Sequence, residues 1–143
     1  MAPSGYSGTL LAKKLGIKDR FKIRLVNEPV YYFDLFTDFP EHVEILTNKK
    51  NAKNLVHYFT KKATDLHRDI QSLRREIFPS GILWISWPKK ASKIATEITE
   101  NLIREIALAN GLVDTKVCAI DEIWSGLKLV IPVKERQSTN ISS

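Results

Sequence analysis

The sequence contains little cysteine and no long apolar run, and each scarcity excludes a class of protein. A single cysteine, Cys118, among 143 residues excludes an internal disulfide and fits a reducing compartment. No apolar stretch approaches the roughly 20 residues that a membrane-spanning helix requires. Residues 1–9 lack the basic region followed by an apolar run that marks a signal peptide. We therefore expect a cytoplasmic protein.

Glycine is also scarce where a nucleotide-binding domain needs it. The chain has only 6 glycines, and none lies in residues 27–31, which follow the first expected strand. Nucleotide and S-adenosylmethionine sites use glycines there, because the backbone must come close to the ligand and direct its amides at it. Pro29 removes one of those amide donors. We therefore predict no cofactor bound in the usual way.

The rest of the composition is typical of one folded domain. Hydrophobic residues make up 43% of the chain and charged residues 27%, which are ordinary values for a globular protein. The length is also that of a single domain with a real core. We expect one domain over residues 1–133, followed by a polar, disordered tail over residues 134–143.

Hydrophobic periodicity predicts alternating strands and helices. The clearest helix has apolar residues at spacings of three and four from Ala63 to Ile77, which places them on one face. The clearest strand is the almost wholly apolar segment from Ile82 to Trp87, as expected for a strand buried on both faces. Shorter patterns predict strands at 21–27, 42–47, 55–59, 113–120 and 127–131, and helices at 9–15, 31–39 and 96–109.

This alternation predicts an α/β fold of three layers with a mostly parallel sheet of about six strands. The connection between the last two strands is too short for a parallel crossover, so we expect a C-terminal antiparallel hairpin. This order of elements resembles the methyltransferase-type Rossmann fold, whose sheet ends in such a hairpin. The resemblance concerns the layout alone and implies no reaction.

Lysine pairs follow three of the expected strands. Lys49-Lys50, Lys61-Lys62 and Lys89-Lys90 each stand where a strand ends, and the net charge is +6. The carboxyl ends of parallel strands meet at one edge, where such pairs would attract an anionic ligand. The alternative is that these lysines are solvated loop residues. Glu28, after the first strand, is a further weak candidate.

Two tryptophans mark a second candidate feature. Trp87 ends the fourth expected strand, three residues after Trp84, so the two indoles point to opposite faces of the sheet. Trp124 stands in the last turn, and we expect it to frame a pocket with Trp87 if their strands are neighbours. The alternative is that both indoles are packing anchors. The ligand-binding candidates are Trp87, Lys89, Lys90, Asp121, Glu122, Trp124 and Ser125.

A catalytic or metal-binding set is not recognisable. His42, His57 and His67 lack the spacing of metal ligands, and His57, within a strand, is expected to be a hydrogen-bonded core residue. Cys118 lies in the middle of a strand, which favours a buried thiol over a nucleophile. We identify no catalytic residue and predict no metal site.

Three segments resemble an uncharacterised bacterial family, the domain of unknown function 3052. They are YSGTLLAKKLGI at residues 6–17, LWISWPKK at 83–90 and GLVDTKVCAIDEIWSGLKLV at 111–130. The last is the most specific, because it combines Lys116, Cys118, Asp121 and Trp124 in one run. The resemblance implies no activity, but its motifs contain most of the candidate residues named above.

These observations favour a domain that binds an anionic small molecule at the carboxyl edge of the sheet. The alternative is a protein-interaction or regulatory module on a degenerate methyltransferase-like fold. Nucleic-acid binding and methyl transfer are less favoured, because the strands expected to form the sheet look buried on both faces and the glycine loop is absent. Neither the ligand, the partner nor the oligomeric state follows from the sequence.

Overall fold

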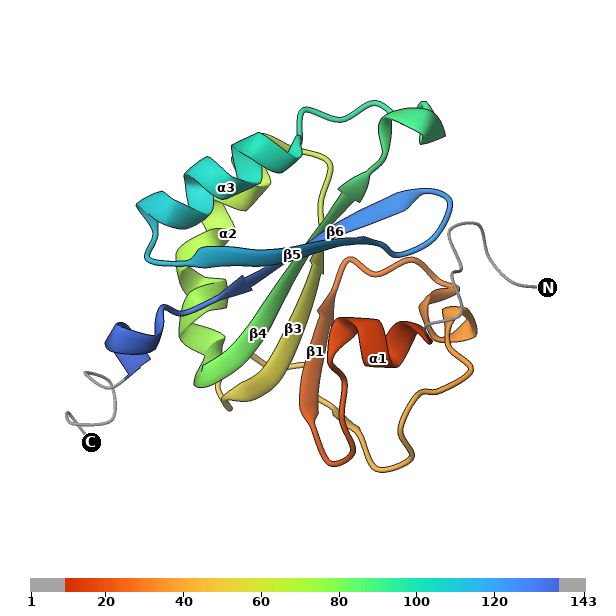
Figure 1. The fold of residues 1–143 in the computed structure, drawn as a ribbon, viewed down its shortest axis with the longest axis vertical. Helices are drawn as coiled ribbons and strands as arrows, with labels where there is room; N and C mark the ends of the chain where they lie inside the picture. Colours follow the sequence, from red (N-terminus) through yellow and green to blue (C-terminus); the bar gives the residue numbers. More distant parts are fainter. Residues whose placement is uncertain (1–9, 137–143) are drawn as a thin grey trace.

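The computed structural model describes residues 10–136 of the chain (Figure 1). Its centre is one six-stranded sheet with the order β2-β1-β3-β4-β6-β5. The strands are β1 (Lys22–Val26), β2 (Glu44–Ile45), β3 (Lys53–Phe59), β4 (Ile77–Pro88), β5 (Val113–Ala119) and β6 (Trp124–Val130). Strands β2, β1, β3 and β4 are parallel, and β6 is antiparallel to both β4 and β5. The predicted α/β sheet with a closing antiparallel hairpin is confirmed.

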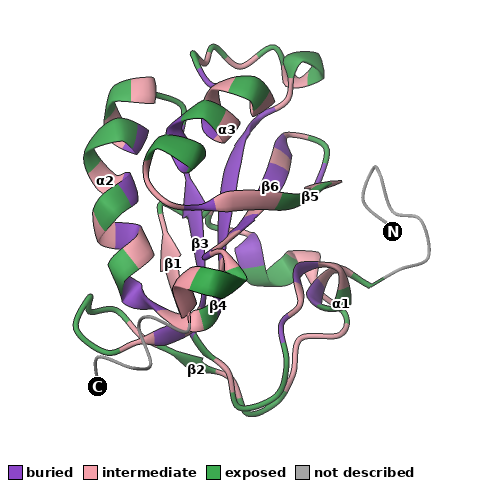
Figure 2. Ribbon diagram, turned by 60° about the vertical axis from the view of Figure 1, so that its left-hand side comes forward, coloured by how far each residue is buried: buried purple, intermediate pink, exposed green. Residues whose placement is uncertain are grey.

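Helices cover both faces of the sheet, unequally. The α-helices are α1 (Leu11–Leu15), α2 (Ala63–Glu76) and α3 (Glu100–Ala109), and the 3-10 turns are η1 (Tyr32–Leu35) and η2 (Lys90–Ser92). One core cluster joins α2 and α3 to the sheet, and a second joins α1 and η1 to the other face. Figure 2 shows buried residues along β3, β4 and the inward faces of α2 and α3. This gives the three expected layers.

The face of the sheet covered by α1 and η1 has less regular structure than the sequence predicts. Residues 31–39 were expected to form a helix, but only η1 forms, with backbone bonds from Tyr32 to Pro29 and from Asp34 to Tyr31. Tyr32 of this turn packs against Phe33, Phe36 and Phe59. The strand expected at 42–47 is likewise only two residues long and lies at the edge of the sheet.

Two side chains fasten the middle of the sheet. Trp84 is fully buried and donates its indole N–H to the carbonyl of Leu15 at 2.9 Å. His57 is fully buried between the Tyr32 hydroxyl, 2.9 Å from Nδ1, and the Ser86 hydroxyl, 2.8 Å from Nε2. The expectation that His57 is a hydrogen-bonded core residue is confirmed.

The order of the chain extends past the expected domain boundary. Residues 133–136 form a helical turn, and Glu135 is joined to Arg74 of α2 by an ion pair of 2.7 Å. The first three residues of the expected disordered tail, 134–136, are therefore packed against the domain, and residues 137–143 lie outside the described part. In residues 10–136, no helix is long and apolar enough to cross a membrane.

Candidate functional site

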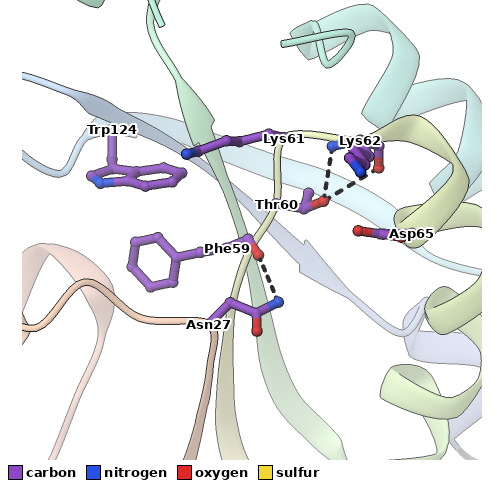
Figure 3. A pocket seen from close by; sticks show the side chains of 7 residues that line it. All are labelled: Asn27, Phe59, Thr60, Lys61, Lys62, Asp65 and Trp124. Carbon is purple, nitrogen blue, oxygen red and sulfur yellow. Dashed lines mark hydrogen bonds between the residues drawn. The ribbon is translucent and has the colours of Figure 1, made fainter. Parts of the chain in front are cut away.

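Among the parallel strands, the chain changes sides at β1: it adds β2 on one side of β1 and β3 on the other. Connections from the two strands therefore leave in opposite directions, and ligands of open α/β sheets bind in the crevice this creates at the carboxyl ends. A pocket of about 310 Å³ occupies this position. We call it the switch-point pocket; it is lined by Asn27, Phe59, Thr60, Lys61, Lys62, Asp65 and Trp124 (Figure 3).

Two turns hold the walls of the switch-point pocket. Asn27 ends β1 in the left-handed conformation, with φ of 58°, which asparagine tolerates better than most residues. Its side-chain amide donates to the carbonyl of Phe59 at 3.3 Å. The Thr60 hydroxyl lies 3.2 Å from both the amide and the carbonyl of Lys62 and so closes the turn into α2 (Figure 3). The ends of β1 and β3 are thereby fixed to each other.

One wall of the pocket is aromatic. The rings of Phe59 and Trp124 meet edge to face, with centroids 5.0 Å apart, an arrangement that aromatic pairs favour. Tyr31 does not line the pocket but interacts with Trp124; burial and the carboxylate of Asp121 raise the pKa of Tyr31, while the indole of Trp124 lowers it. The rings of Phe59 and Trp124 thus give this wall apolar surface without charge.

The opposite wall carries positive charge. Lys61 and Lys62 are exposed, and within residues 10–136 neither makes an ion pair. Asp65 also lines the pocket; its carboxylate lies 3.2 Å from Arg68, which binds Asp69 as well, so the lining carries two lysines and one carboxylate. In Figure 3 the Lys61 side chain extends toward the Trp124 indole. The pocket thus presents two cations at the start of α2, where the helix dipole adds to the positive potential.

The titratable groups of the described residues have definite surroundings. They include no group of three or more His, Cys, Asp or Glu side chains that would hold a metal ion. The fully buried His57 is unsuited to acid–base work near neutral pH, since burial lowers its pKa to about 3. Burial also raises the pKa of the Cys118 thiol. The switch-point pocket therefore offers a ligand two exposed lysines beside aromatic surface.

The pocket expected between Trp87 and Trp124 does not form. Strand β4 pairs with β6 so that Trp87 lies opposite Ser125 and Pro88 opposite Trp124. Since neighbouring positions alternate between faces, Trp87 joins the core under α2 and α3, and Trp124 joins the core of the other face. A backbone bond of 2.7 Å from Lys89 to Ile123 closes the edge between the two strands. The prediction of one pocket framed by both indoles was wrong.

The predicted ligand-binding residues next to Trp124 in the sequence lie outside the switch-point pocket. Asp121 is buried, and its Oδ1 accepts from the amides of Ile123 and Trp124 at 2.8 Å each, so it shapes the turn into β6. Glu122 is exposed, and Ser125 lies within β6 opposite Trp87. None of the three lines the switch-point pocket.

The three lysine pairs share an edge of the sheet but not one cavity. Lys61 and Lys62 line the switch-point pocket, whereas Lys49 lines a separate pocket of about 340 Å³ with Arg24 and Arg68. Lys90 belongs to a third, on the α3 side. Lys50, Lys89 and Glu28 line none of the three. The three pairs therefore do not share any one of these three cavities.

The sequence reasoning missed four residues of the pocket, Asn27, Phe59, Thr60 and Asp65. Asn27 and Thr60 follow a correctly expected strand, Phe59 ends one, and Asp65 lies in the first turn of α2, so the element pattern contained part of the signal. The strand order was also needed, because only the reversal between β1 and β3 singles out these two strand ends.

Several solved structures that superpose on this chain are methyltransferases. A magnesium protoporphyrin IX methyltransferase from Synechocystis PCC 6803 with bound SAH superposes with a TM-score of 0.58 at 10% identity, covering 85% of this chain and 78% of that one. A putative type 11 methyltransferase from Sulfolobus solfataricus gives 0.56 at 13%, covering 86% and 90%. A ribosomal protein L11 methylase from Lactobacillus delbrueckii subsp. bulgaricus gives 0.55 at 9%, covering 84% and 74%.

The sequence itself matches no protein-family model and no curated protein. Identities this low show a shared fold and nothing more. The chain therefore has the methyltransferase-like Rossmann fold that its layout resembled.

Proposed function

We propose that this domain binds a small anionic molecule in the switch-point pocket. The observation that carries the proposal is the meeting of two unpaired lysines, Lys61 and Lys62, with an aromatic wall at the position where open α/β sheets take their ligands. Charged hydrogen bonds from lysine to a phosphate or carboxylate are among the stronger polar contacts in proteins. A cavity of about 310 Å³ lies at the small end of the range for small-molecule sites.

Trp124 provides the readout for a binding experiment. We would titrate the protein with pyrophosphate, ADP and the uncharged nucleoside adenosine, and follow tryptophan fluorescence. Pyrophosphate and ADP should change the emission, and adenosine should bind at least tenfold more weakly because it lacks the charge. In Trp124→Phe the change should be lost, whereas Trp87→Phe should keep it.

Matched lysine variants test the charge. Lys61→Ala/Lys62→Ala should weaken pyrophosphate at least tenfold, while Lys18→Ala/Lys22→Ala, which removes two exposed lysines elsewhere, should leave the affinity unchanged. The proposal fails if no anionic probe binds, or if both double variants weaken binding equally.

Methyl transfer is a second candidate, favoured by the fold alone. The SAM cofactor carries a sulfonium and an ammonium group, which Lys61 and Lys62 would repel, and residues 27–30 (Asn, Glu, Pro, Val) contain no glycine. Calorimetry with S-adenosylhomocysteine separates the two candidates. Binding tighter than that of ADP would favour the cofactor, and we expect the reverse order.

The interaction module and the membership of the uncharacterised family stay proposals. Exposed apolar side chains such as Val30, Phe33 and Leu108 come from different parts of the chain. A protein partner that binds through these side chains in a pull-down experiment would support the interaction module. Loss of that capture in Phe33→Ser, with anion binding intact, would separate the two functions.

A further inference from the structure

The cavity that Lys90 lines lies at the same edge of the sheet, on the α3 side. It has a volume of about 490 Å³ and lies between the end of β4, the segment 89–99 and the first turn of α3. We call it the α3-side cavity. In Figure 1 this segment arches above the end of β4 before it enters α3. Trp87, which the switch-point pocket does not use, forms part of the wall.

The floor of the α3-side cavity is apolar. Trp87 is 8% exposed and Ile98 3%, and both belong to the core cluster beneath α2 and α3. Ile94 adds a half-buried aliphatic side chain. A ligand that rests here covers hydrocarbon and indole surface, so its own body must be apolar.

The rim of the same cavity is positively charged. Lys90 and Lys93 line it, and neither makes an ion pair within residues 10–136. Glu100 is the one acidic residue of the lining; it is paired with Arg104, which also binds Asp114. An acidic group on the ligand would therefore find two cations without an acidic partner and one carboxylate that is already ion-paired.

The segment that forms the rim is held in place. Lys93 has a left-handed backbone with φ of 61°, which is uncommon for a residue other than glycine and persists only where neighbours hold it. Its amide donates to the carbonyl of Lys90 at 3.0 Å. Further along, the Thr96 hydroxyl donates to the carbonyl of Lys61 at 2.8 Å. The cavity is thus preformed, and it shares no lining residue with the switch-point pocket.

We propose that the α3-side cavity binds an amphiphilic monoanion, a carboxylic acid with an aromatic or branched hydrocarbon body. The body packs on Trp87, Ile94 and Ile98, and the carboxylate is held by Lys90 and Lys93. The inference does not depend on the switch-point pocket, because it rests on other residues and on a different ligand chemistry.

The test compares 1-naphthoate with the uncharged 1-naphthylmethanol at low ionic strength, followed through the amide shifts of the ¹⁵N-labelled protein. Both compounds should shift the amides of residues 87–100, and the acid should bind at least tenfold more tightly. Lys90→Ala/Lys93→Ala should remove this preference and leave the affinity for the alcohol unchanged. The matched variant Lys18→Ala/Lys22→Ala should keep the preference.

Three outcomes would overturn the proposal. One is the absence of shifts in residues 87–100, and another is equal affinity for the acid and the alcohol in the unmodified protein. The third is a set of shifts confined to Asn27 and residues 59–65, which would move the acid to the switch-point pocket and leave the proposed function intact. Conversely, failure of pyrophosphate to bind would end the proposed function without affecting this inference.

Discussion

The cations at the two ends of the sheet have opposite surroundings. At the amino end, Lys53 is fully buried and lies 3.1 Å from the carboxylate of Glu76. Arg24 binds the same carboxylate through two hydrogen bonds of 2.7 and 2.6 Å. At the carboxyl end, Lys61 and Lys62 are exposed and, within residues 10–136, have no acidic partner.

This difference separates charges that maintain the fold from charges that are available to a ligand. Burying an ion is tolerated only where a partner and further hydrogen bonds compensate it, and Glu76 supplies that compensation for two cations. The side chains of the lysines at the carboxyl end are exposed and make no ion pair within residues 10–136. Of the two groups, only the second can bind something new without loss of structure.

The largest expected effect is therefore at the amino end. Glu76→Gln removes the negative charge and leaves Lys53 buried without a counter-ion, so we expect a loss of about 3 kcal/mol in the free energy of unfolding. Urea denaturation measures this loss. The exposed Glu105→Gln is the control and should change stability by less than about 0.5 kcal/mol. Equal losses of unfolding free energy in the two variants would contradict the structural role of the charges at the amino end.

Asp121 tests whether a paired residue at the carboxyl end is structural as well. Asp121→Ala leaves the buried amide of Trp124 without its acceptor, which should cost about 2 kcal/mol of unfolding free energy. The adjacent and exposed Glu122→Ala should cost almost nothing. A loss confined to Glu122→Ala would contradict the geometry of this turn.

His57 predicts a pH dependence of stability. Burial lowers the pKa of His57 to about 3 in the folded chain, against an ordinary value of about 6.5 when unfolded. The unfolded state therefore binds the proton first, so stability is full above pH 6.5 and falls by about 1 kcal/mol for each unit below it, toward pH 3.

The His57→Gln variant isolates this contribution from that of the carboxylates. We would measure the unfolding free energies of the two proteins at pH 7, 6, 5 and 4.5. The two values should converge as the pH falls, because only the unmodified protein loses stability through protonation of His57 in the unfolded state. Parallel curves would show that His57 is not buried in its neutral form.

The smallest expected effect concerns the unpaired lysines. Lys61→Ala/Lys62→Ala should leave the free energy of unfolding unchanged or raise it by up to about 0.5 kcal/mol, since cations are unfavourable at a helix start. The thermal midpoint provides the measurement. A clear loss of stability would show that these lysines maintain the fold, and the contrast between the two ends would then disappear.

The fold could be predicted from the sequence further than the site could. The apolar segment at 82–87 and the periodic one at 63–77 determine β4 and α2, because burial of long patterned stretches dominates local preference. The short segments at 31–39 and 42–47 were misjudged, since their packing at the edge of the sheet is decided by tertiary contacts.

The prediction of the site failed because the sequence does not reveal strand register or strand order. Trp124 was expected in the last turn but is the first residue of β6, and a difference of one register position from Trp87 places the two side chains on opposite faces. No sequence pattern shows which residue of β6 faces which residue of β4. Similarly, Asn27 and Thr60 gain significance only from the reversal between β1 and β3.

The most direct test of the central claim is the amide-shift map of the ¹⁵N-labelled protein titrated with pyrophosphate. Our account predicts shifts centred on Asn27 and on residues 60–65, which disappear in Lys61→Ala/Lys62→Ala and persist in Lys18→Ala/Lys22→Ala. Shifts centred instead on Lys49 and Arg24, or on residues 89–93, would contradict it, as would a spectrum that pyrophosphate leaves unchanged.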